Sequence, residues 1–160
     1  VNNHPPGMRI VAEAGGYNSA IVDSTVLISR TVSHIIHSAF GSAGQRCSAV
    51  RLCAVNEHIF EDFKVALLGA IQTQNVGDPF KIETDIGPVI NDVAVRKINE
   101  FVQLAKNSGA EVYEFDVPSD GNYVSPTVIV WDDYKQIESF ERAEECFGPV
   151  LNLVKIKKWE

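Results

Sequence analysis

Apolar side chains recur along this chain with two different spacings, which predict helices and strands in alternation. A spacing of three to four residues indicates helices at 26–40, 57–74 and 91–107, and a shorter helical run at 137–144. Compact apolar runs indicate strands at 50–55, 111–115, 124–131 and 150–156, with a further β-like run at 9–12. Strands that alternate with helices predict an α/β domain with a largely parallel sheet.

Polar residues, glycines and a proline indicate where the predicted helices and strands begin and end. The cluster Asp23-Ser24-Thr25 predicts the N-cap of the first helix, and Asn91 predicts that of the third. Gly41 and Gly44 break the first helix before a short polar loop. Pro126 interrupts an apolar run, so we expect that strand to lie at a sheet edge or to contain a bulge.

Composition narrows the classes of protein that fit. The 160 residues suffice for one domain with a core, and the net charge of -7 disfavours nonspecific binding to nucleic acids or anionic membranes. No apolar run reaches the length of a membrane span, and three cysteines are too few for a disulfide framework. We therefore expect a soluble cytoplasmic protein. The chain lacks an initial Met and stops directly after a strand-like run, which predicts a piece of a longer protein.

One cysteine occupies a position where a nucleophile could act. Cys47 lies in the loop Gly44-Gln45-Arg46-Cys47-Ser48, between a predicted helix and a predicted strand. A thiol at such a break is accessible to substrate, and nearby backbone N–H groups can stabilise an oxyanion. The alternative is a buried structural cysteine, because free cysteines are often buried.

Two further segments favour the catalytic alternative. Glu13 precedes the pair Gly15-Gly16, so its carboxylate has little bulk beside it and suits a general base acting through water, although a turn residue is the other explanation. Downstream lies Glu145-Cys146-Phe147-Gly148-Pro149. Together, in this order and at this spacing, the three segments resemble the aldehyde dehydrogenase superfamily over essentially the whole chain. Gly77-Asp78-Pro79, Asp85-Ile86-Gly87-Pro88 and Ser125-Pro126-Thr127-Val128 match as landmarks.

This resemblance implies a fold and a set of roles. The fold is the three-layer α/β/α, cysteine-bearing catalytic domain of that family, here a single domain over residues 1–160. Cys47 would be the nucleophile that forms a thiohemiacetal and then a thioester, and Glu13 the base that activates water. Glu145 would hydrogen-bond the nicotinamide ribose of NAD, and Phe147 would pack beside the nicotinamide. Ala14 and Cys146 replace the family's frequent leucine and isoleucine without altering this chemistry.

Within the superfamily, residues 12–24 and 42–51 look most like the 1-pyrroline-5-carboxylate (L-glutamate γ-semialdehyde) dehydrogenase module of bifunctional proline utilisation A proteins. Such a module oxidises the semialdehyde to glutamate with NAD in proline catabolism. Ser48 would contact the substrate carboxylate, with Arg46 assigned to the same task; a backbone cap and a salt bridge are their alternative roles. The parent would be a bacterial homo-oligomer, and FAD would belong to a separate proline dehydrogenase domain.

Several points stay open in the sequence. Another aldehyde specificity, or a non-catalytic structural relative, are the competing functions, and the choice between NAD and NADP is unsettled. The resemblance implies that most of the nucleotide-binding domain precedes Glu13. This chain contains no G-x-G-x-x-G, and the isolated chain is expected to be inactive. Cys53 and Cys146 are interpreted as packing residues. No metal is expected, since ligand-spaced cysteine and histidine clusters are missing.

Overall fold

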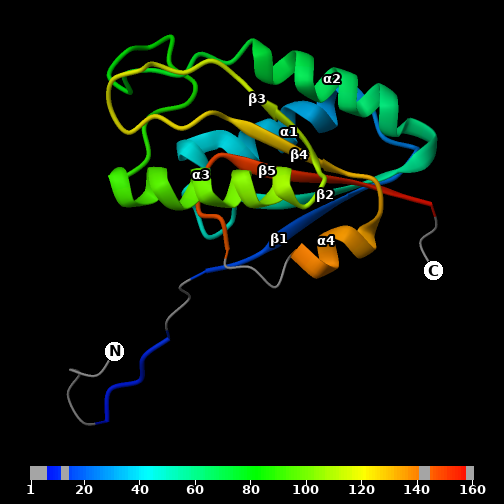
Figure 1. Ribbon diagram of the computed structural model, residues 1–160, viewed down its shortest axis with the longest axis horizontal. Coiled ribbons are helices and arrows are strands. Elements are labelled where there is room, and N and C mark those ends of the chain that lie inside the picture. Colours follow the sequence, from blue (N-terminus) through cyan, green and yellow to red (C-terminus); the bar gives the residue numbers. More distant parts are fainter. Residues whose placement is uncertain (1–6, 12–14, 141–144, 158–160) are drawn as a thin grey trace.

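The fold is built on one mixed sheet of five strands (Figure 1). The computed structural model describes residues 7–11, 15–140 and 145–157. The strand order is β1-β2-β5-β4-β3. Neighbours among the first four of these are parallel, and only β3 runs antiparallel to β4. The strands are β1 Asn18–Val22, β2 Val50–Asn56, β3 Glu111–Glu114, β4 Thr127–Trp131 and β5 Val150–Ile156.

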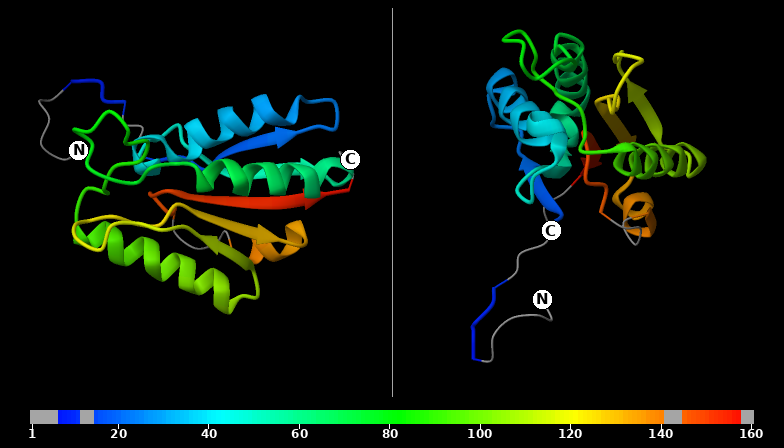
Figure 2. Two further views of the ribbon diagram at one scale, coloured as in Figure 1. Left: turned by 90° about the horizontal axis from the view of Figure 1, so that it is seen from above. Right: turned by 90° about the vertical axis from the view of Figure 1, so that its left-hand side faces the viewer.

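Helices cover both faces of the sheet and make three layers (Figure 2). Helices α1 (Ile28–Phe40) and α2 (Phe60–Gln72) pack against each other and against β2 on one face. Helices α3 (Asp92–Asn107) and α4 (Tyr134–Phe140) contact β4 on the other face. This arrangement confirms the three-layer α/β/α fold with a mostly parallel sheet. Within the described residues, no helix combines the length and apolarity needed to cross a bilayer.

The core lies between these layers and explains why the central strands read as continuous apolar runs. Every residue of β4 is buried, as are the first five of β5. A strand covered by helices on both faces needs apolar side chains at successive positions rather than at alternate ones. Trp131 at the end of β4 packs against Phe140 of α4, with ring centroids 4.9 Å apart, and Phe140 also contacts Phe101 of α3.

Most predicted elements form close to their expected bounds. Asn91 caps α3 as predicted, because its Oδ1 accepts a hydrogen bond from the Ala94 N–H at 2.9 Å. The predicted helix at 57–74 is a short 3₁₀ turn, η2 (Glu57–Ile59), followed by α2. Gly41 ends α1 and begins a second 3₁₀ turn, η1 (Gly41–Gly44).

Three local predictions are wrong. Residues 9–11 form no strand, and Ala12 lies outside the described residues; the first strand is instead β1, which pairs with β2. The cluster at residues 23–25 is a turn in which Asp23 Oδ1 accepts from the Thr25 N–H, and α1 begins only at Ile28 without a side-chain cap. Pro126 marks neither an edge nor a bulge: β4 starts just after it and pairs on both sides.

Candidate active site

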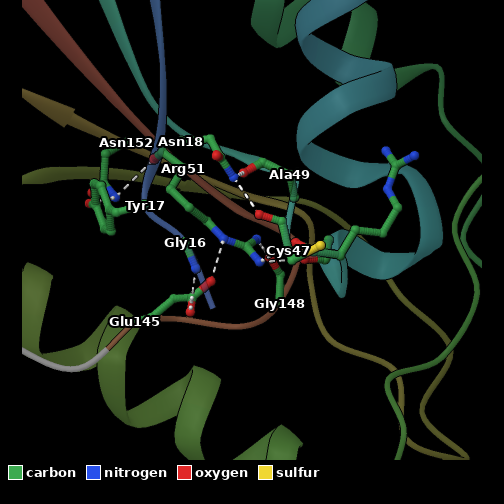
Figure 3. Close-up of polar contacts among 11 residues, drawn as sticks. Gly16, Tyr17, Asn18, Cys47, Ala49, Arg51, Glu145, Gly148 and Asn152 are labelled. Carbon is green, nitrogen blue, oxygen red and sulfur yellow. Dashed lines mark hydrogen bonds and ion pairs between the residues drawn. The ribbon is translucent and has the colours of Figure 1, made fainter. Parts of the chain in front are cut away.

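Three segments far apart in the sequence meet at one edge of the sheet (Figure 3). Strands β1, β2 and β5 are parallel neighbours, so their amino ends lie side by side. The segments that lead into these strands are residues 15–17, 45–49 and 145–149. The site therefore forms at the amino ends of the strands, whereas open α/β sheets usually bind ligands at the carboxyl ends.

A left-handed turn delivers the chain from α1 to the Cys47 loop. Ser42, Ala43 and Gly44 have φ angles of 56°, 53° and 66° in succession. Such angles strain residues that carry a Cβ, by about 1–2 kcal/mol each. At Gly44 the reason for glycine is also steric, because a Cβ there would lie 2.1 Å from the Gly148 carbonyl oxygen. This close approach places the Cys47 loop directly against the 145–149 segment.

Cys47 is the exposed cysteine of the chain, on a turn that other segments hold in place. The Ala49 N–H donates to the Arg46 carbonyl at 3.1 Å and closes the turn. Asn18, at the start of β1, donates from Nδ2 to the carbonyls of Cys47 at 2.6 Å and Ala49 at 3.1 Å. Within the described part of the chain the Cys47 N–H donates no hydrogen bond, so it is available to an oxyanion. Ser48 is exposed beside it.

The side chains of Gln45 and Arg46 turn away from Cys47 and fasten the loop to its surroundings. Arg46 Nη2 donates to the carbonyls of His37 at 2.7 Å and Ser38 at 3.2 Å, at the C-terminal end of α1. A cation is favourable there because the helix dipole is negative at that end. Gln45 Oε1 accepts from the Ile90 N–H at 3.0 Å and so holds the segment before α3.

Glu145 and Phe147 face the loop from the segment before β5. The Glu145 side chain is 26% exposed, and its Oε2 accepts from the Gly16 N–H at 3.4 Å. A Cβ at Gly15 would lie 2.8 Å from the same oxygen, so the glycine there leaves room for the carboxylate. Phe147 is 40% exposed. The structure thus brings Glu145 and Phe147 to the Cys47 turn, whereas Glu13 lies outside the described residues.

Sequence reasoning missed Arg51, the charged residue at the centre of this arrangement. Arg51 is only 1% exposed, in β2, and Figure 3 shows its guanidinium between the Cys47 turn and Glu145. It donates to the carbonyls of Gly44 at 2.6 Å and Gly148 at 2.9 Å. Burial lowers the pKa of Arg51, and the neighbouring Glu145 carboxylate partly offsets that shift. The available signal was a lone charged residue inside an otherwise apolar strand.

A buried amide behind the site links three strands. Asn152 of β5 accepts from Trp131 Nε1 at 2.9 Å and donates to the Arg51 carbonyl at 3.2 Å and to the Tyr17 hydroxyl at 3.0 Å. A buried amide with all these partners is satisfied rather than destabilising. This network holds the backbone of Arg51 through its carbonyl oxygen.

The other two cysteines are packed into the core. Burial raises the pKa of Cys53 to about 12, and burial raises that of Cys146 to about 12 as well. Both thiols therefore stay protonated at neutral pH and are poor nucleophiles. Among the residues that the structure describes, no three His, Cys, Asp or Glu side chains gather closely enough to hold a metal ion.

The sequence and the fold of the chain match one known class of proteins. The model of the aldehyde dehydrogenase family matches residues 3–160, nearly the whole chain. The chain therefore belongs to the aldehyde dehydrogenase family. Among curated relatives, it is 35% identical over 157 residues to the bifunctional protein PutA of Escherichia coli, and 28% identical over 156 residues to the 1-pyrroline-5-carboxylate dehydrogenase of Bacillus subtilis.

These relatives are much longer than the chain. The match covers 93% of the chain but 12% of the E. coli protein, and 95% of the chain but 29% of the B. subtilis protein. The chain thus corresponds to one section of each relative, and that section includes the Cys47 loop.

Solved structures agree with the fold. A crystal structure of a Bradyrhizobium japonicum proline utilization A (PutA) mutant superposes with a TM-score of 0.82 at 33% identity, over 89% of this chain and 14% of that chain. A Staphylococcus aureus betaine aldehyde dehydrogenase in complex with NAD⁺ superposes with a TM-score of 0.82 at 28% identity, over 91% of this chain and 30% of that chain.

Proposed function

We propose that this chain carries the nucleophilic cysteine of a longer, NAD-dependent enzyme that oxidises L-glutamate γ-semialdehyde to glutamate in proline catabolism. The observation that carries the proposal is the position of Cys47: an exposed thiol on a turn that Asn18 and Arg51 hold against Glu145 and Phe147. The relatives that act on 1-pyrroline-5-carboxylate by name support the choice of substrate.

Cys47 performs the covalent step. Its thiolate attacks the aldehyde carbon and forms a thiohemiacetal, and the Cys47 N–H, which has no acceptor among the described residues, stabilises the developing oxyanion. NAD, when bound, supplies the acceptor for the hydride that leaves the thiohemiacetal carbon. The thioester that then remains on Cys47 is hydrolysed by water that Glu13 activates as a general base. Glutamate leaves, and the free thiol is restored.

The residues before β5 suit the cofactor that this reaction needs. Glu145 Oε1 is buried and has no hydrogen-bond donor among the described residues, and Oε2 has one long contact at 3.4 Å. A carboxylate with unused acceptor capacity matches the paired hydroxyls of a ribose. The partly exposed Phe147 ring offers a flat apolar surface to a nicotinamide. We therefore assign Glu145 and Phe147 to NAD binding.

The carboxylate of the semialdehyde needs polar partners near the nucleophile. Ser48, exposed next to Cys47, is proposed to donate a hydrogen bond to it. Arg46, on the same loop, is proposed to contribute positive charge to the site, with its guanidinium anchored by the His37 and Ser38 carbonyls at the end of α1. The complete enzyme is proposed to be a cytoplasmic bacterial homo-oligomer.

Two cysteine variants in the full-length enzyme test this function. Cys47→Ala should reduce NAD reduction with glutamate semialdehyde by at least about a thousandfold, because no other group replaces the thiolate. Cys53→Ala is the matched control, since Cys53 is fully buried in β2 and should leave turnover intact. Unchanged turnover in Cys47→Ala would reject the mechanism. A kcat/KM no higher for the semialdehyde than for an uncharged aldehyde of similar length would reject the substrate assignment.

A further inference from the structure

Arg51 is a buried charge that the proposed chemistry does not use. Its side chain is 2% exposed, and no part of the reaction above requires a cation at that position. Burying a guanidinium carries a desolvation penalty that stability alone rarely repays, since well-packed apolar residues often serve as well. Its location therefore calls for a functional explanation.

The guanidinium of Arg51 contacts both loops of the site. Nη2 donates to Gly44 O at 2.6 Å, just before the Cys47 turn, and Nη1 donates to Gly148 O at 2.9 Å. Nε lies 3.6 Å from Glu145 Oε1, and the Phe147 ring centroid lies 5.3 Å from Cζ. One side chain thus bridges the loop of the nucleophile and the segment assigned to the cofactor.

We propose that Arg51 is a positioning residue, which fixes Glu145 and Phe147 relative to the Cys47 turn and thereby sets the affinity for NAD. This inference rests on the proposed function, because it takes Glu145 and Phe147 as cofactor contacts. Arg51 acts on NAD binding through these two side chains.

The geometry of the ion pair supports a positioning role over a purely stabilising one. Arg51 Nε and Glu145 Oε1 are both buried, and neither has a hydrogen-bond partner among the described residues. At 3.6 Å they attract each other without forming a hydrogen bond. The charge therefore orients the carboxylate at its buried Oε1, while Oε2, whose one contact is to the Gly16 N–H at 3.4 Å, keeps acceptor capacity for another donor.

The planar fork of arginine is needed for this task. Its two terminal nitrogens donate in different directions, toward Gly44 and toward Gly148, while Nε faces Glu145. A lysine ammonium is a compact point charge and cannot match this planar set of donors. Arg51→Lys therefore keeps the charge and loses the bridge.

The test uses the full-length enzyme and measures NAD binding by calorimetry together with steady-state kinetics. Arg51→Met should raise both the dissociation constant and the KM for NAD by about tenfold or more, because misplaced contacts weaken binding and catalysis steeply. The KM for the aldehyde should change by less than about twofold. Arg51→Lys should also weaken NAD binding, by a smaller factor.

Leu67→Ala is the control for lost stability. Leu67 is fully buried in α2, and α2 contributes no residue to the site, so the substitution should lower the unfolding temperature and leave NAD affinity unchanged. A double variant, Arg51→Met with Glu145→Gln, should bind NAD about as weakly as the weaker single variant, because both substitutions disable the same contact.

The outcomes separate this inference from the proposed function. Wild-type affinity for NAD in Arg51→Met, or in Arg51→Lys if Arg51→Met does not fold, overturns the positioning role while the function stands. Independent, multiplicative effects of Arg51→Met and Glu145→Gln also overturn it. If the wild-type enzyme does not bind NAD and the Cys47→Ala variant keeps its activity, the proposed function and the inference are overturned together.

Discussion

The side-chain amide of Asn18 donates to the carbonyl oxygen of Cys47 over 2.6 Å. The same nitrogen donates to Ala49 at 3.1 Å, so one residue at the start of β1 holds both ends of the turn. Because β1 and β2 are parallel neighbours, the register that pairs Asn18 with Val50 also brings this amide to the loop before β2. The pairing of β1 with β2 therefore also places the Asn18 amide that holds the Cys47 turn.

Removal of this amide should loosen the Cys47 turn. Asn18→Ala deletes two hydrogen bonds and should lower the free energy of unfolding by about 1–2 kcal/mol, and it should change the rate of Cys47 alkylation by iodoacetamide. Asn91→Ala, which removes the N-cap of α3, should cost about 1 kcal/mol and leave that rate unchanged. Equal alkylation rates in Asn18→Ala and the wild type would show that the Cys47 turn keeps its conformation without the Asn18 amide.

Gly44 should tolerate no side chain. Gly44→Ala forces a Cβ to within 2.1 Å of the Gly148 carbonyl at a φ of +66°, so unfolding should become easier by more than about 2 kcal/mol. Gly69 in α2 is the matched control, because a Cβ there meets nothing within 4 Å. Gly69→Ala should stabilise the chain by about 0.5–1 kcal/mol. Urea denaturation measures both, and a mild effect at Gly44 would contradict the left-handed turn.

The buried thiol of Cys53 should make stability fall in alkali. Its pKa is raised to about 12 in the folded chain, so above about pH 9 the unfolded chain loses this proton first. The contribution of the protonated Cys53 thiol to the free energy of unfolding is complete below about pH 9 and is lost as the pH rises toward 12. Cys53→Ala should remove about 1.4 kcal/mol per pH unit from the slope of the free energy of unfolding in this window.

Ile129→Val is the control for this pH dependence. Ile129 is fully buried and cannot titrate, so its substitution should lower stability by about 0.5–1.5 kcal/mol at every pH and leave the slope as in the wild type. The same slope in Cys53→Ala and the wild type would mean that folding does not raise the pKa of Cys53.

The sequence predicts those features that depend on local pattern. Periodicity located α3 and Asn91 as its cap, and the apolar run at 150–156 identified β5, because both signals lie within a few residues. The order and spacing of three short segments were enough to identify the family, which the family match confirms. The individual roles of Cys47, Glu13, Glu145, Phe147, Ser48 and Arg46 stay predictions.

What the sequence could not predict depends on partners distant along the chain. The partners that partly offset the burial of Arg51 include the Gly148 carbonyl, which lies 97 residues away along the chain. The engagement of Arg46 with the end of α1 likewise depends on how the loop folds back. Pro126 misled the prediction for β4 because a proline just before the first paired residue removes no ladder hydrogen bond.

The most direct test of the account is to trap the covalent intermediate. In the full-length enzyme, Glu13→Gln should complete one oxidation of glutamate semialdehyde with NAD and then stall, because no base activates the water that hydrolyses the thioester. Peptide mass spectrometry should then find a glutamyl group on Cys47, with Cys53 and Cys146 unmodified. A glutamyl group on another residue, or an oxidation that proceeds in Cys47→Ala, would contradict the assignment of Cys47 as the nucleophile.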